Sequence, residues 1–154
     1  MTIHKAEKKD IIDLCDMWFE LQNHHRNLAA YMEETKDWRS DKEKELLLVL
    51  ESNNSQIFIA RDFNGAVGYI RGCVKEMSPV FINPKVGSID ELFVREGVRR
   101  EGVGKKLVEY LKLWLISKGA AEIAVHVSRD NRQAKDFWDR MGFETISLRM
   151  IKKI

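Results

Sequence analysis

Regular alternation between β-prone runs and amphipathic helical stripes predicts an α/β sandwich for this chain of 154 residues. Between Val86 and Leu107, an apolar β-prone run gives way to a polar turn and then to a helical stripe. Earlier in the chain, two β-prone runs flank Asn64-Gly65, a dipeptide typical of tight hairpin turns. Because no repeat, linker or low-complexity tract interrupts this alternation, we expect a single domain over residues 1–154.

The first half of the chain is expected to place two helices among its strands. Apolar residues recur on one face between Ile11 and Leu21, and Ser40 or Asp41 is a candidate cap for a second helix. The expected elements are a strand at 2–5, a helix from Glu7 to about Leu28, a helix from Ser40 or Asp41 to about Ser52, strands at 56–62 and 66–77, and a loop at 78–85.

The second half continues the same alternation. The β-prone run ends at Val94, and apolar residues repeat at helical spacing from Val103 until Gly119, a residue that suits a helix C-terminus. The remaining expected elements are a strand at 122–127, a helix capped by Asp130 or Asn131 and ended by Gly142, and a closing strand at 143–151.

Two glycines, Gly102 and Gly104, stand at the expected start of the helix that follows the β-prone run. The first N–H groups of a helix lack intrahelical partners and the helix dipole is positive there, so a phosphate group fits this position. Glycine lets a pyrophosphate approach the backbone closely. The basic residues around them are Arg99, Arg100, Lys105 and Lys106. A lone G-x-G is a weak signal, however, and a helix with small first residues and a solvated basic face would explain it.

Two longer motifs strengthen the phosphate interpretation. The segment Arg99-Arg100-Glu101-Gly102-Val103-Gly104 fits the pattern (Gln or Arg)-x-x-Gly-x-(Gly or Ala), and it resembles the acyl-CoA-binding motif of the GCN5-related N-acetyltransferase (GNAT) family. A second segment, from Asn131 to Phe143, is similar to the family's N-x-x-A-x-x-F-Y-x-x-x-G-F pattern. The order and spacing of the two motifs make the resemblance specific in the second half, whereas the first half matches only in its pattern of elements.

The resemblance implies a mixed, mostly antiparallel sheet with splayed central strands, flanked by about four helices, and acetyl-CoA as co-substrate. The backbone of residues 92–94 would pair with the pantetheine arm, while their side chains could pack in the core. The backbone of residues 100–105 would hold the pyrophosphate, and Asn131 would reach the pantetheine or act as a plain helix cap. The cofactor-binding residues implied are Leu92, Phe93, Val94, Arg99, Arg100, Glu101, Gly102, Val103, Gly104, Lys105, Asn131 and Phe137.

The implied reaction transfers an acetyl group from the thioester to a primary amine by direct attack in a ternary complex. The amine must lose a proton, and family members often use an acidic residue in this strand as the base, acting through water. Asp90 and Glu91 are the candidates. Strand alternation places them on opposite faces, so one would face the amine unless a bulge intervenes. Either could instead charge the end of the strand or pair with an arginine.

Trp138 is the third candidate catalytic residue, and it stands where many family members carry a tyrosine that protonates the leaving thiolate. An indole N–H donates hydrogen bonds but is not an acid near neutral pH. The thiolate would then leave unassisted or take a proton from water, since Tyr110 suits helix packing better than this role. Because of this departure, the alternative function is an acyl-CoA-binding module of the same fold with little or no catalysis.

The acceptor is expected to be an amine of a small molecule or peptide, bound over residues 24–38 and the loop 78–85. The acidic residues of the first segment would attract a cation, and its aromatic residues would stack on one. A solvated acidic loop with two packed aromatic side chains is the simpler interpretation. The residues concerned are Glu33, Glu34 and Asp37, together with Tyr31 and Trp38.

Composition limits the remaining partners. A net charge of +2 gives no reason to expect nucleic acid, and no apolar run approaches the ~20 residues needed to cross a bilayer. The N-terminus lacks the apolar core of a signal peptide, so a cytoplasmic location is expected. Cys15 and Cys73 form no metal-binding pattern, so we expect no metal. A dinucleotide-binding fold is excluded because Leu107 stands where the third glycine belongs, and a homodimer through the closing strand is expected by analogy.

Overall fold

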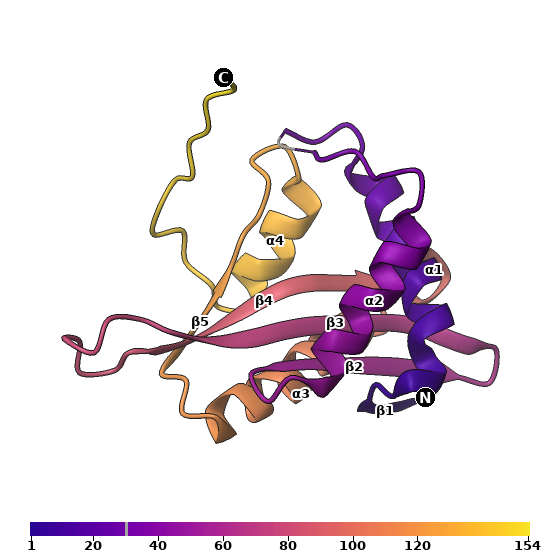
Figure 1. Ribbon diagram of the computed structural model, residues 1–154, viewed down its shortest axis with the longest axis horizontal. Coiled ribbons are helices and arrows are strands. Elements are labelled where there is room, and N and C mark those ends of the chain that lie inside the picture. Colours follow the sequence, from indigo (N-terminus) through magenta and orange to yellow (C-terminus); the bar gives the residue numbers. More distant parts are fainter. Residues whose placement is uncertain (30) are drawn as a thin grey trace.

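The structure is a computed structural model that describes residues 1–29 and 31–154. In this part of the chain, five strands form one sheet in sequential order, and four helices flank it (Figure 1). The elements are β1 (Thr2–Lys5), η1 (Lys8–Asp10), α1 (Ile11–His25), α2 (Trp38–Glu51), β2 (Ser55–Asp62), β3 (Gly65–Glu76), β4 (Lys85–Val94), η2 (Glu96–Val98), α3 (Val103–Ser117), β5 (Glu122–Val125) and α4 (Arg132–Arg140).

The sheet is mixed, as the sequence resemblance implies. Strands β1 to β4 pair antiparallel, and β5 joins β4 in parallel through the crossover helix α3. Helices α1 and α2 cover one face of the sheet, and α3 covers the other (Figure 1). Each face has its own apolar core, because the strand side chains alternate between the two sides. Leu14 and Leu46 belong to the first core, whereas Leu107, Leu111 and Trp138 belong to the second.

A buried ion pair attaches the start of α1 to the sheet. Asp10 is fully buried, and its carboxylate accepts hydrogen bonds from the Glu7 backbone N–H (2.8 Å) and from Arg61 Nη2 on β2 (2.6 Å). Burial alone would raise the pKa of Asp10, but these two donors outweigh burial and lower it. The bonds to Glu7 also explain why a 3-10 turn precedes α1, which begins four residues later than the sequence pattern predicts.

Helix boundaries differ modestly from the predicted ones. Helix α1 ends at His25, and α2 begins at Trp38 rather than at Ser40 or Asp41. Asp41 is not a cap, because its own N–H bonds to the Asp37 carbonyl and it therefore lies inside the first turn. Elsewhere the predicted ends hold: Gly119 and Gly142 follow α3 and α4 with positive φ, and the Asn131 side chain caps α4.

The predicted closing strand at 143–151 is wrong. Residues 143–154 follow α4 as an irregular tail that leaves the sheet, drawn in yellow in Figure 1. The alternation that predicted a strand is present, since Ile146, Leu148 and Met150 recur at every second position. A strand also needs a neighbour for its backbone groups, and the sheet of the described residues ends at β5.

Within residues 1–29 and 31–154, no helix is long and apolar enough to cross a membrane. Both cysteines are free thiols: Cys15 is buried on α1, and Cys73 is partly buried on β3.

Candidate active site

Strands β4 and β5 diverge after a short stretch of pairing. The parallel pairing runs from Val86 opposite Glu122 to Ile89 opposite Val125, where β5 ends. Strand β4 continues to Val94, and its other edge stays paired with β3. The backbone of residues 90–94 therefore turns an edge without a strand neighbour toward the gap, which suits an extended ligand that pairs like a strand.

A cleft of about 1260 Å³ opens at this divergence. It runs from the N-terminus of α3, past the free edge of β4, to the loop between α1 and α2. The cleft brings together nearly all the site residues predicted from the sequence, and only Glu101 does not line it. The predicted residues that line it are Asp90, Glu91, Leu92, Phe93, Val94, Arg99, Arg100, Gly102, Val103, Gly104, Lys105, Asn131, Phe137 and Trp138.

The N-terminus of α3 is open to a ligand. Its first intrahelical bond joins the Lys106 N–H to the Gly102 carbonyl, so the N–H groups of residues 103–105 precede the helical ladder. Gly102 is the cap residue and has no side chain to occupy those donors. Arg100 adopts a positive φ of 69° and Gly102 one of 79°, so the turn before the helix includes a strained non-glycine residue. Such strain gathers at functional sites.

Side chains around this turn shape the entrance. A Cβ on Gly104 would lie 3.5 Å from the Phe137 ring, an ordinary contact, so the protein itself tolerates a methyl group there. Arg99 does not point freely at the cleft, because its Nε donates a hydrogen bond to the Val94 carbonyl (2.8 Å). Arg99 thus fixes the last residue of β4, which is a positioning role in addition to its charge.

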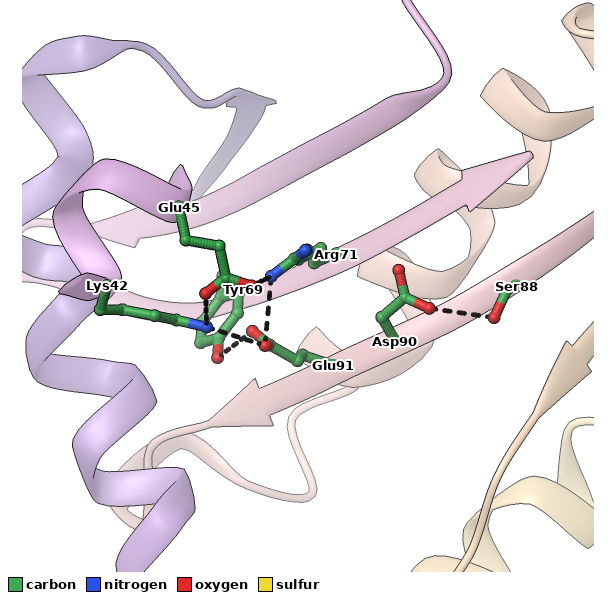
Figure 2. A network of polar contacts seen from close by, with 7 residues as sticks. All are labelled: Lys42, Glu45, Tyr69, Arg71, Ser88, Asp90 and Glu91. Atoms are coloured by element: carbon green, nitrogen blue, oxygen red, sulfur yellow. Dashed lines mark hydrogen bonds and ion pairs between the residues drawn. The ribbon is translucent and has the colours of Figure 1, made fainter. Parts of the chain in front are cut away.

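A bulge in β4 changes the orientation of the two candidate bases. Arg71 of β3 pairs with Glu91, and the next residue, Gly72, pairs with Ile89, so Asp90 is the extra residue. A bulge interrupts the alternation of side chains. Asp90 accepts a hydrogen bond from Ser88 Oγ (3.0 Å), and both carboxylates point to the face covered by α2 (Figure 2).

Glu91 is held by a network of donors (Figure 2). Its carboxylate accepts hydrogen bonds from Tyr69 Oη (2.9 Å) and Lys42 Nζ (3.2 Å), and Arg71 lies 3.5 Å away. Lys42 also bonds to Glu45 (2.8 Å), and its side chain is only 7% exposed. Burial and then the charge of Glu91 raise the pKa of Tyr69 well above its usual value, so Tyr69 remains a donor.

Asp90 is in a different environment. Its side chain is exposed and lines the cleft, whereas Glu91 is half-buried among its partners. The Glu91 carboxylate accepts hydrogen bonds from two side chains, Tyr69 and Lys42, whereas Asp90 accepts one from Ser88. The geometry therefore distinguishes the two neighbours: both line the cleft, but Asp90 is exposed, whereas Glu91 is bound by side chains of α2 and β3.

Two histidines at the end of α1 line the same cleft and were not among the predicted bases. His24 Nε2 lies 3.3 Å from Arg99 Nη2. Burial, reinforced by the neighbouring His24, lowers the pKa of His25, so its imidazole is neutral near pH 7 and able to accept a proton. Nothing in the local sequence pattern marks this residue, because its helix ends in a polar segment.

Trp138 lies in a packed aromatic cluster at the wall of the cleft. Its ring meets Phe137 at 4.8 Å and Phe143 at 5.1 Å in edge-to-face geometry, and only 6% of the residue is exposed. Asn131 Oδ1 accepts the Ala134 N–H (3.1 Å), which makes it a helix cap. Tyr110 packs edge-on against Phe58 and does not line the cleft.

The end of the cleft beside residues 24–38, where the sequence predicts the acceptor, differs from the prediction in three respects. Glu34 is paired with Arg26 and accepts a hydrogen bond from Tyr31 (2.7 Å), and the Arg26 hydrogen bond is the larger cause that lowers its pKa to about 2. Asp37 and the loop 78–85 do not line the cleft. The acidic residues that line this end besides Glu34 are Glu33, Asp41 and Glu45.

One hydrogen bond spans the cleft. The Ala29 N–H, in the loop after α1, donates to Asp130 Oδ2 (3.0 Å), in the loop before α4. Figure 1 shows these two loops meeting above the gap between β4 and β5. Residues from the first and the second half of the chain therefore close one side of the cleft.

The fold and the cleft have the geometry of a protein that holds an extended, phosphate-bearing ligand between diverging strands. A family model described as Acetyltransferase (GNAT) family matches residues 15–143. The chain therefore belongs to the GNAT family and is an acetyl-CoA-dependent N-acetyltransferase. Among the residues that the structure describes, no three or more His, Cys, Asp or Glu side chains form a group suited to a metal ion.

Two relatives carry names that agree with this assignment, and a solved structure shares the fold. An uncharacterized N-acetyltransferase from Archaeoglobus fulgidus is 28% identical over 90% of this chain and 89% of its own. An aminoglycoside N(6')-acetyltransferase from Salmonella typhimurium is 28% identical over 62% of this chain and 67% of its own. The solved aminoglycoside 6'-N-acetyltransferase from Acinetobacter haemolyticus is 18% identical, covers 100% of this chain and 99% of that one, and superposes with a TM-score of 0.77. This last likeness concerns the fold.

Proposed function

We propose that this N-acetyltransferase acetylates a primary amine of a small cationic molecule by direct attack in a ternary complex. The observation that carries the proposal is that the exposed Asp90 lies in one cleft with the open N-terminus of α3. One end of the cleft suits a phosphate-bearing ligand and the other end is acidic. Relatives named aminoglycoside N(6')-acetyltransferases support a small polycationic acceptor as the class to test first.

The N–H groups of residues 103–105 would bind the pyrophosphate, and the free edge of residues 90–94 would pair with the pantetheine arm. This arrangement fixes the thioester relative to the amine, and such positioning alone lowers the barrier considerably. The residues present fit acetyl-CoA, because the glycine at position 104 leaves the backbone accessible and Phe137 borders it.

The chemical step needs one proton acceptor from the protein. The amine nitrogen forms a bond to the acetyl carbon, the carbon–sulfur bond breaks, and the amine proton passes to Asp90, directly or through water. His25 is the second candidate for this role, since its neutral imidazole lines the same cleft. The departing sulfur leaves as thiolate or takes a proton from water, because Trp138 supplies no acidic proton.

A binding module with little catalysis is the second candidate function. The packing of Trp138 between two phenylalanines favours it, since this position is occupied by a packing residue rather than by an acid. The two candidates share the acyl-CoA site and differ only in turnover.

Two measurements in sequence test the proposal. Calorimetric titration with acetyl-CoA and with CoA should show saturable binding, and no binding at millimolar ligand would exclude both candidate functions. Thiol release from acetyl-CoA is then followed with a panel of amines that includes polyamines, aminoglycosides, amino acids and short peptides. Release that depends on a cationic small molecule supports the enzyme, whereas binding without release with any amine would leave only the binding module.

A further inference from the structure

Ser88 is a buried polar residue on β4 that does not line the cleft. Only 6% of it is exposed, whereas Asp90, two residues later, is exposed and lines the cleft. The Oγ of Ser88 donates a hydrogen bond to Asp90 Oδ1 (3.0 Å), as Figure 2 shows. Ser88 therefore contacts the proposed base from a position that lies outside the cleft lining.

The side chain of Asp90 has more freedom than those of its neighbours on β4. Asp90 is the extra residue of the bulge, since Ile89 and Glu91 pair with consecutive residues of β3. Because it is also exposed, neither regular strand pairing nor packing fixes the direction of its carboxylate. The hydrogen bond from Ser88 supplies that direction.

Arg71 of β3 offers the Asp90 carboxylate a competing partner. Among the residues that the structure describes, Arg71 Nε is a buried nitrogen without a hydrogen-bond partner. A buried N–H without a partner costs free energy, which a carboxylate that moved toward it would recover. Burial lowers the pKa of Arg71, but neighbouring carboxylates, Asp90 among them, outweigh burial and raise it. Asp90 therefore lies within electrostatic reach of this guanidinium.

An ion pair with Arg71 would change the Asp90 carboxylate in two ways. It would turn the carboxylate toward β3, away from the free edge of β4 where the pantetheine arm is proposed to bind. The adjacent positive charge would also stabilise the carboxylate, which would then take a proton from an amine less readily. A serine hydroxyl is neutral, so it directs the same group without adding a charge.

Cys73 makes the surroundings of Ser88 neutral as well. Cys73 pairs with Ser88 in the register of β3 and β4. Burial, followed by the charge of Asp90, raises the pKa of the Cys73 thiol, so the thiol stays protonated near pH 7. Asp90 thus lies between a neutral pair of side chains and a charged one, and its direction decides which of them it contacts.

We propose that Ser88 is a positioning residue for acetyl transfer, whose hydroxyl holds Asp90 off Arg71 and keeps the carboxylate directed at the cleft. This role rests on the proposed function, in which Asp90 takes the proton of the attacking amine. The proton passes from the amine nitrogen to the Asp90 carboxylate, and the Ser88 proton stays on its own oxygen. Ser88 touches no reacting atom and acts on the rate only through Asp90.

Two substitutions of nearly equal shape isolate the Ser88 hydroxyl, because threonine retains a donor and valine does not. Ser88→Val is expected to lower kcat about tenfold or more relative to Ser88→Thr, since a small misplacement of a catalytic group is enough for such a loss. KM for the amine and Kd for CoA should be the same in both variants. Equal kcat values in the two variants would overturn the proposal. Should either fail to fold, Ser88→Ala is compared with the unchanged chain, and equal kcat values there would be equally decisive.

Combination with Asp90→Asn shows whether Ser88 acts through Asp90. In the Asp90→Asn background, Ser88→Ala should cause no further loss of kcat, because residues that act as one unit are not additive. A full additional loss would mean that Ser88 acts by another route. A low kcat in Asp90→Asn with a normal kcat in Ser88→Ala would refute the role of Ser88 alone. An Asp90→Asn variant with the kcat of the unchanged chain would refute the base itself.

Crystal structures of the unchanged chain and of Ser88→Ala test the position of Asp90 without any turnover. We expect the Asp90 carboxylate to bond to Ser88 in the unchanged chain and to lie within hydrogen-bond distance of Arg71 Nε in the variant. Because this result needs no acceptor, it remains decisive even if thiol release is absent with every amine. A carboxylate that keeps its direction in Ser88→Ala would show that Ser88 does not position it.

Discussion

Asp90 and Glu91 are neighbours in sequence, yet both carboxylates lie on the same face of β4 (Figure 2). The bulge at Asp90 is responsible, because it removes one residue from the pairing with β3. The consequence is a division of roles. Glu91 is bound by Tyr69 and Lys42, whereas Asp90 remains accessible from the cleft.

Substitution of the two carboxylates should separate these roles. Asp90→Asn is expected to lower kcat by about 10²- to 10⁴-fold, the usual contribution of a general base, with little change in the Kd for CoA. Glu91→Gln should instead lower the unfolding temperature, because it removes the charge that balances Lys42 and Arg71. Equal kcat losses in both variants would contradict the division, and a larger loss in His25→Gln would transfer the base role to His25.

The phosphate site can be tested at Gly104. We expect Gly104→Val to weaken CoA binding by roughly tenfold or more, which corresponds to about 1.4 kcal/mol. The reason is that the nearest protein atoms leave room for a Cβ, so the added atoms obstruct the ligand rather than the fold. Gly97→Ala is the matched control, since a Cβ there meets no atom within 4 Å. Equal CoA affinity in Gly104→Val and the unchanged chain would place the pyrophosphate elsewhere.

The proposed preference for a cationic acceptor can be tested by neutralising acidic residues that line the cleft. Glu33→Gln/Asp41→Asn should raise KM for a cationic amine and leave KM for acetyl-CoA nearly constant, because a local field is lost at one end only. Asp37→Asn is the control, since Asp37 does not line the cleft. Added salt should reduce the difference between the double variant and the unchanged chain. An equal rise in KM for the cationic amine in Asp37→Asn would show that the effect does not come from the acidic residues that line the cleft.

Trp138 should behave as a packing residue. Trp138→Phe is expected to cost about 1–2 kcal/mol of stability, because a smaller ring leaves space between Phe137 and Phe143. Its kcat should stay close to that of the unchanged chain at a temperature where both are folded. Phe143→Leu disturbs the same cluster without touching the indole N–H. A large kcat loss in Trp138→Phe that Phe143→Leu does not share would make the indole N–H a catalytic donor.

Asp10 gives the fold a pH dependence with a defined sign. Its pKa is lowered in the folded state, so the unfolded chain binds more protons and stability decreases as the pH falls. Asp10→Asn should destabilise the protein by about 1–3 kcal/mol near pH 7, through the lost charge opposite Arg61. The difference in stability between the two chains should begin to narrow below pH ~4, where the unfolded carboxylate binds its proton, and should close as the pH falls through the lowered pKa of folded Asp10. Urea unfolding at several pH values measures this difference, and a difference that does not vary with pH would refute the account.

Local patterns were sufficient to predict the turn before α3 and the starts of α3 and α4. Gly102, Gly104 and Asn131 occupy the positions expected of them, because turns and caps depend on a few neighbouring residues. The bulge at Asp90 could not be predicted, since it is a property of the register between β3 and β4.

Lys42 shows a signal that was overlooked. It lies on the buried stripe of α2 with Leu46 and Val49, and a lysine within an apolar stripe indicates a buried partner.

The predicted closing strand at 143–151 shows the reverse, a sequence pattern without the structure that it predicts. Its alternating residues satisfy the pattern of a strand, but the pattern carries no information about the edge that a strand requires.

The hydrogen bond between the Ala29 N–H and Asp130 joins the loops that lead to the two ends of the cleft. One partner belongs to the loop that leads toward the acidic wall, and the other immediately precedes Asn131. If a ligand at one end of the cleft changes the affinity for a ligand at the other end through this bond, the second ligand must change the affinity for the first by the same factor, because linkage between two binding equilibria is reciprocal. Acyl donor and acceptor affinities should therefore be measured each in the presence of the other.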